Sequence, residues 1–117
     1  MKRLVQLLLS TALMSFCAAT QAAIHCEGLV TYALLYSDGT VLVVGAWRGD
    51  ATYLCNTSGT WGGIPPEICL SWYALASKAA ADSKVFAVYY NTDSYTCANL
   101  PTYSFSLVPT YAGVKRQ

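Results

Sequence analysis

Apolar and aromatic residues gather into strand-like runs over much of this chain. Three strand-like runs come first, at residues 28–36, 40–47 and 51–56, separated by the turn sequences SDGT and RGD. The second run is apolar on both faces, which is typical of a strand inside a sheet rather than at its edge. Two further strand-like runs follow at residues 84–91 and 102–108.

The period changes to that of a helix between residues 66 and 82. The apolar residues of this segment recur at spacings of four, three, one and three and so share one helical face: Ile68, Trp72, Leu75, Ala76 and Ala79. Pro66 suits the first helical position, and the negative charge of Glu67 suits the positive end of the helix dipole. The preceding segment, TSGTWGGIPP, is rich in Gly and Pro and predicts a loop.

The predicted order is strand-strand-strand-helix-strand-strand, in a mainly β domain with one helix. Five strands with a helix between the third and the fourth is the order of the OB-fold, a five-stranded and partly open barrel. We expect the helix to close one end of the barrel, with Trp72 and Leu75 pointing inward. A ferredoxin-like sheet would need a second helix, which the pattern does not contain.

The first 22 residues have the pattern of a cleaved secretory signal peptide, with a basic start, an apolar middle and small residues before a cut after Ala22. The apolar middle is short for a membrane span, and no later stretch resembles one. We therefore expect residues 23–117 to form a single disulfide-stapled domain that is secreted or periplasmic. Without Lys2 and Arg3, five basic side chains face six acidic ones, a balance that disfavours nucleic acid as a partner.

Four cysteines belong to the expected mature domain, and an even number in a small exported chain predicts two disulfides. Four cysteines allow three pairings, and sequence alone does not choose among them. We favour Cys55–Cys69, which would close a short flexible loop, together with Cys26–Cys97, which would tie the start of the domain to a late loop. A metal site is disfavoured because no CxxC pair occurs and His25 is the only histidine.

The sequence favours a binding module over an enzyme. Catalysis requires a nucleophile beside a base, a tuned pair of carboxyl groups or a metal, and a single histidine with six scattered carboxylates does not assemble any of these. No catalytic residue and no cofactor are expected. The chain instead holds nine tyrosines and three tryptophans, which tolerate a half-wet position and favour recognition.

Four pieces of the chain form a set: YLC ending at Cys55, a second cysteine fourteen residues later, the helical segment WYALASKAA and the strand VFAVYY. Together they resemble the B subunits of AB5 toxins of the subtilase cytotoxin and typhoid toxin group. The resemblance implies an OB-fold exported from a Gram-negative bacterium that assembles as a homo-pentamer. It also implies binding of sialylated or other host glycans and association with a toxin A subunit or another exported protein.

In that family the sugar pocket uses a serine near the start of the first strand and a tyrosine from the strand after the helix. Tyr90 matches the tyrosine, whereas Glu27 stands at the serine position. A carboxylate there would repel the carboxylate of a sialic acid unless an arginine intervened. The hairpin around Asp38 is also longer than the family's, and the second disulfide is not theirs.

Aromatic side chains supply the remaining candidate ligand contacts. Tyr89 and Tyr90 alternate on one strand, so that one faces the core and the other faces outward. Trp61, in the Gly-rich loop, is the tryptophan that we expect to be exposed. Sugars bind by stacking their C–H faces on such rings, although ordinary strand and loop packing would also account for these residues.

Two other functions fit the same observations. A rigid stapled domain suits a periplasmic protein-interaction or hydrolase-inhibitor role, because a rigid loop loses little entropy on docking. Residues 56–66 would then be the inhibitory element. The third interpretation is an envelope structural protein without a ligand.

Overall fold

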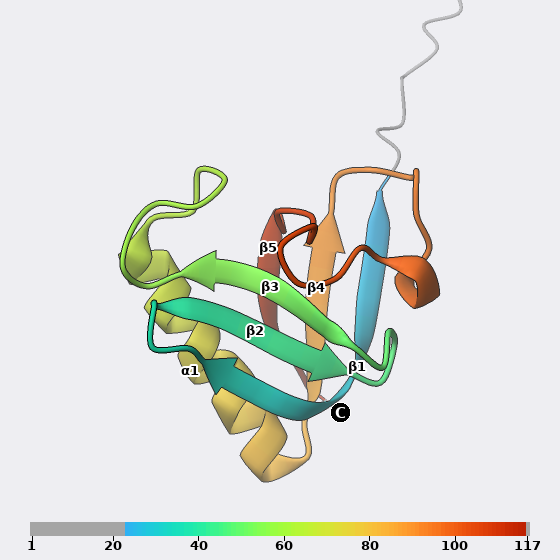
Figure 1. Cartoon of the computed structure of the whole chain (residues 1–117). Coiled ribbons are helices and arrows are strands. Elements are labelled where there is room, and N and C mark those ends of the chain that lie inside the picture. Colours follow the sequence, from blue (N-terminus) through green and yellow to red (C-terminus); the bar gives the residue numbers. More distant parts are fainter. Residues whose placement is uncertain (1–22, 117) are drawn as a thin grey trace, which may run out of the picture.

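The computed structural model describes residues 23–116 of the chain, and the expected signal peptide lies outside them. Five strands and one long helix make up this part of the chain (Figure 1). The elements are β1 (Ile24–Leu35), β2 (Thr40–Gly45), β3 (Ala51–Asn56), α1 (Pro66–Asp82), β4 (Val85–Tyr90), the 3-10 helix η1 (Cys97–Asn99) and β5 (Tyr111–Lys115). The mainly β class, and the position of the helix between the third and fourth strands, are as predicted.

The strands form one antiparallel sheet in the order β3-β2-β1-β4-β5. The first half of β1 pairs with β4 and the second half pairs with β2. A bulge between Val30 and Tyr32 marks the change of partner, and the two halves of the sheet cross one another at a large angle (Figure 1). Strands β3 and β5 are the two edges, so the sheet is not closed. An isolated parallel bridge joins Thr52 of β3 to Tyr103.

Helix α1 buries a stripe of side chains that it turns toward the sheet: Cys69, Trp72, Ala76 and Ala79. Trp72 points inward as predicted, but Leu75 does not, because its side chain is 38 % exposed. Ile68 is also exposed. At about 100° per residue both residues lie at the margin of a stripe whose centre is nearer Ala76. Ser83 ends the helix in a left-handed conformation, and its N–H donates to the Ala79 carbonyl.

The two predicted disulfides are both present. Cys26–Cys97 joins β1 to η1 across 71 residues, and Cys55–Cys69 joins β3 to the first turns of α1 across 14 residues. Apart from Cys97, which is half-buried, these cysteines lie in the core. Each bond therefore connects distant parts of the chain at the place where the interior is packed.

The prediction of a last strand at residues 102–108 is wrong. This segment forms turns, and the last strand is β5, which begins at Tyr111. Tyr103 has a left-handed backbone, with φ of 53°, which interrupts an extended strand. The N–H groups of Phe105 and Ser106 donate to the carbonyls of Thr102 and Tyr103 and close successive turns. Although aromatic and polar residues alternate in this segment, they do not form a buried face, and Phe105 is 83 % exposed.

Candidate functional site

Side chains that alternate outward on β1, β4 and β5 line up in rows across the sheet. The strand register places His25 beside Tyr89 and Tyr89 beside Tyr111, and in the next row Glu27 beside Ala87 and Ala87 beside Gly113. Lys115 follows two residues further along β5. We call this surface the β1–β4–β5 face, made of His25, Glu27, Ala87, Tyr89, Tyr111, Gly113 and Lys115.

Two tyrosines form the aromatic part of the β1–β4–β5 face. The rings of Tyr89 and Tyr111 are stacked, with centroids 4.7 Å apart and planes at 8°. The hydroxyl of Tyr111 lies 3.4 Å from Nδ1 of His25, and the two rings meet edge to face at 6.3 Å. Tyr111 therefore leans back across β4 toward β1. Its side chain is 46 % exposed, so Tyr111 offers the accessible aromatic surface while Tyr89 supports it.

Two opposite charges form the polar part of the same face. Nζ of Lys115 donates a hydrogen bond of 2.8 Å to Oε1 of Glu27. The two residues belong to β1 and β5, which are about 10 Å apart because β4 runs between them, and the small Ala87 leaves room for the pair. Nε2 of His25 lies 3.2 Å from the other Glu27 oxygen. His25 thus contacts both the aromatic and the charged part of the face.

The hydrogen bond from Lys115, ahead of its charge and the contact with His25, holds the pKa of Glu27 below its ordinary value. Desolvation opposes this shift without overcoming it. The Glu27 carboxylate is therefore ionised at neutral pH. Its two oxygens can accept hydrogen bonds from a ligand, and the Lys115 ammonium can donate them.

Open space lies above Gly113, between Tyr111 and Lys115 on the same strand. A Cβ placed on Gly113 would meet no atom within 4 Å, and the neighbouring residue in the row is the small Ala87. A ligand ring can therefore approach the backbone here, with an aromatic ring at one side and an ion pair at the other. This arrangement suits recognition of a small polar ring.

The structure brings together two of the four predicted ligand-binding residues, Glu27 and Tyr89. As the alternation required, one tyrosine of the pair faces inward. This is Tyr90, which is 2 % exposed, and its burial raises the pKa of its hydroxyl to about 12. Tyr90 thus has almost no surface to offer a ligand. Trp61 is half-buried in the loop before α1, where its backbone bonds with Ile64, and it is not part of the β1–β4–β5 face.

Sequence reasoning missed three of the interacting side chains of the β1–β4–β5 face: His25, Tyr111 and Lys115. Tyr111, Gly113 and Lys115 alternate in YAGVK, and such a run two residues after Pro109 is a signal that a short strand begins there. Nothing in the sequence marks His25 for this face, and only the pairing of β1 with β4 places it beside Tyr89.

Within residues 23–116, no group of three or more His, Cys, Asp or Glu side chains is placed to hold a metal ion. Nor does any helix in the same range have the length and apolar character needed to cross a membrane.

The fold and the site define a small, doubly disulfide-bonded antiparallel β domain with one helix and a sheet face that joins stacked tyrosines to an ion pair. No family model, no curated protein and no solved structure matches this chain.

Proposed function

We propose that this chain is an exported, non-catalytic module that binds a carbohydrate at the β1–β4–β5 face. The observation that carries the proposal is the stack of Tyr111 on Tyr89 beside the Glu27–Lys115 ion pair, with open space over Gly113 between them. Sugars present an apolar C–H face to aromatic rings and hydroxyls to polar groups. Tyr111 supplies the first surface, and Glu27 and Lys115 supply adjacent acceptors and donors.

The charges of the face favour a neutral sugar over a sialylated one. Glu27 and Lys115 neutralise each other at 2.8 Å. The carboxylate of a sialic acid would have to compete with Glu27 for the Lys115 ammonium and would face the Glu27 charge at close range. Vicinal hydroxyls of a neutral hexose can instead bond to both groups without separating them.

The order of the elements along the chain, with the helix between the third and fourth strands, supports an OB-type barrel as the scaffold. Closing such a barrel requires contact between the two edge strands, β3 and β5. The N–H of Tyr103 donates to the carbonyl of Ala51, and the side-chain oxygen of Ser106 accepts from the N–H of Tyr53. The chain just before β5 thus covers the edge of β3, and in our proposal it takes the place of direct pairing between the edge strands.

Export and assembly are part of the proposal. Two disulfides in a small domain are typical of an oxidising compartment. The resemblance to toxin B subunits adds a ring of five and an exported partner protein. The mass of the oxidised domain in solution tests this assembly directly, because a monomer would remove it without affecting the sugar site.

The sugar site is tested by screening the oxidised domain on an array of neutral and sialylated glycans, followed by an NMR titration with the best ligand. Tyr111→Ala should weaken binding roughly 3- to 10-fold, since one aromatic surface is lost. Tyr32→Ala is the matched control, because Tyr32 is an exposed strand tyrosine on the other half of β1. Absence of binding to any glycan, or equal losses in the two variants, would reject the site.

A further inference from the structure

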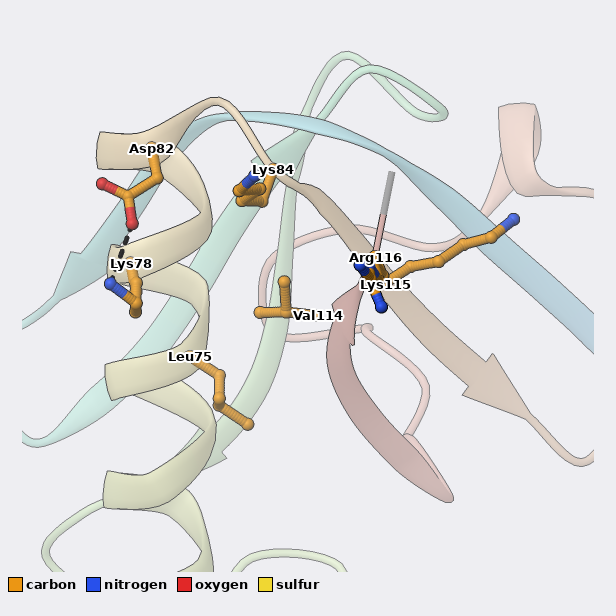
Figure 2. A pocket seen from close by; sticks show the side chains of 7 residues that line it. All are labelled: Leu75, Lys78, Asp82, Lys84, Val114, Lys115 and Arg116. Carbon is orange, nitrogen blue, oxygen red and sulfur yellow. Dashed lines mark hydrogen bonds and ion pairs between the residues drawn. The ribbon is translucent and has the colours of Figure 1, made fainter.

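A cavity of about 360 Å³ lies between α1 and the end of β5 (Figure 2). Its apolar lining comes from Leu75 of α1 and Val114 of β5, both partly exposed. Val114 points to the opposite side of β5 from its neighbour Gly113, so this cavity and the β1–β4–β5 face lie on different sides of the strand. The volume is within the range of small-molecule sites. We call it the α1–β5 cavity.

Four cations and one carboxylate also line the α1–β5 cavity. Lys78 is paired with Asp82 at 2.8 Å. Lys115 is paired with Glu27, and Figure 2 shows its side chain extending away from the cavity. Two cations are therefore already neutralised by carboxylates of the same chain.

The other two cations are Lys84 and Arg116. Among the residues that the structure describes, no carboxylate lies within ion-pair distance of either. Lys84 acts on Asp82 only through its charge, as the last of the causes that hold the pKa of Asp82 low. The cavity thus combines an apolar lining with two positive charges that lack a close counter-ion.

We propose that the α1–β5 cavity binds a small amphipathic anion. Its head group, a carboxylate, a sulfate or a phosphate monoester, bonds to Lys84 and Arg116, and its short apolar body lies on Leu75 and Val114. Leu75, at the margin of the buried helix stripe, is exposed enough to contact that body. This ligand is chemically distinct from the sugar proposed for the β1–β4–β5 face.

The end of α1 sets where the head group can lie. The negative end of the helix dipole and the Asp82 carboxylate both oppose an anion at the last turn. Lys78 neutralises Asp82, and the Ala79 carbonyl already accepts hydrogen bonds from the N–H groups of Ser83 and Lys84. The head group therefore lies toward the strand, between Lys84 and Arg116, rather than over the helix.

The proposal is tested by NMR titration of the oxidised domain with hexyl sulfate, with inorganic sulfate and 1-hexanol as head-only and body-only probes. Hexyl sulfate should bind at least about tenfold more tightly than either, because inorganic sulfate lacks the buried methylenes that each add to the affinity and 1-hexanol lacks the charged head group that bonds to the cations. Amide shifts should concentrate at Leu75, Lys84 and Val114. Hexyl phosphate and hexanoate then rank the head groups. Equal binding of hexyl sulfate and 1-hexanol would overturn the proposal.

Charge-matched variants separate a built site from general attraction. Lys84→Gln should weaken hexyl sulfate binding roughly 3- to 5-fold, the effect of one exposed charge contact, whereas Lys115→Gln removes the same charge and should leave it nearly unchanged. Leu75→Asn should weaken hexyl sulfate but not inorganic sulfate. Equal effects of the two lysine variants would overturn the proposal. Sugar binding should instead be weakened by Lys115→Gln and left nearly unchanged by Lys84→Gln. The proposals for the two sites can therefore be rejected independently of each other.

Discussion

Removing the two disulfides one at a time should separate stability from sugar binding. Cys55–Cys69 closes a loop of 14 residues and Cys26–Cys97 one of 71. From the entropy of the unfolded chain, the shorter bond contributes about 3 kcal/mol and the longer about 4.4 kcal/mol to the free energy of unfolding. Both values are a large share of the ~5–15 kcal/mol that holds a domain folded.

The two bonds differ in their position relative to the proposed sugar site. Cys26 lies between His25 and Glu27 on β1, so its bond to Cys97 fixes the strand segment that carries both residues. Cys55 lies on β3, the opposite edge of the sheet. Replacing Cys26 and Cys97 by alanine should therefore destabilise the domain and weaken sugar binding, whereas the same change at Cys55 and Cys69 should only destabilise it.

The assay is urea unfolding followed by tryptophan fluorescence without reductant, combined with a sugar titration of each variant in the absence of urea. A loss below about 1 kcal/mol for either pair would refute the entropy argument. If the variant lacking Cys55–Cys69 were folded yet lost sugar binding as fully as the other, the link between the Cys26 bond and the sugar site would be wrong.

Three further predictions follow from single residues. Gly113→Leu should abolish sugar binding by filling the open space, while unfolding stays within ~0.5 kcal/mol of the parent in thermal melts; Gly113→Ala, the control, should still bind. Lys115→Gln should raise the pKa of Glu27 toward its ordinary value, so that on acidification sugar binding is lost at a higher pH than in the parent. NMR shifts of the Glu27 carboxyl carbon measure this pKa, and an unchanged pKa would contradict the prediction. The pKa of Tyr90, about 12, exceeds the ~10 of an unfolded tyrosine, so its contribution to stability, roughly 3 kcal/mol, is complete below pH ~10 and is lost as pH rises through ~12. Absorbance at alkaline pH should show a tyrosine that titrates near pH ~12 and that Tyr90→Phe removes, and an unchanged curve would show that Tyr90 is not buried.

Elements with local signals were predicted well. The helix bounds 66–82 and the strand bounds 51–56 match α1 and β3, because a proline pair begins the helix and polar residues end it. The prediction of a strand at residues 102–108 was wrong because the side chains of this segment alternate as those of a true strand do. What separates the two is the left-handed backbone of Tyr103, which the alternation of side chains does not record.

The candidate site was only half predictable for a different reason. Glu27 and Tyr89 could be chosen from the chain, but the residues that contact them in the candidate site could not. Lys115 is 88 residues from Glu27, and only the order β1-β4-β5 and its register bring the two together. A shift of one residue in that register would turn Lys115 toward the helix and Val114 toward Glu27.

The position of β1 supports the proposed sugar site, small as it is. The first half of β1, which carries His25 and Glu27, pairs with β4, and between these two residues it sends Cys26 into the core. Gly28 follows at once, where a Cβ would lie only 3.3 Å from that of Ala46. The backbone that carries Glu27 is thus held by hydrogen bonds, a disulfide and close packing. A contact group that is already ordered loses little entropy when a ligand binds, so a rigid strand favours the sugar site that we propose.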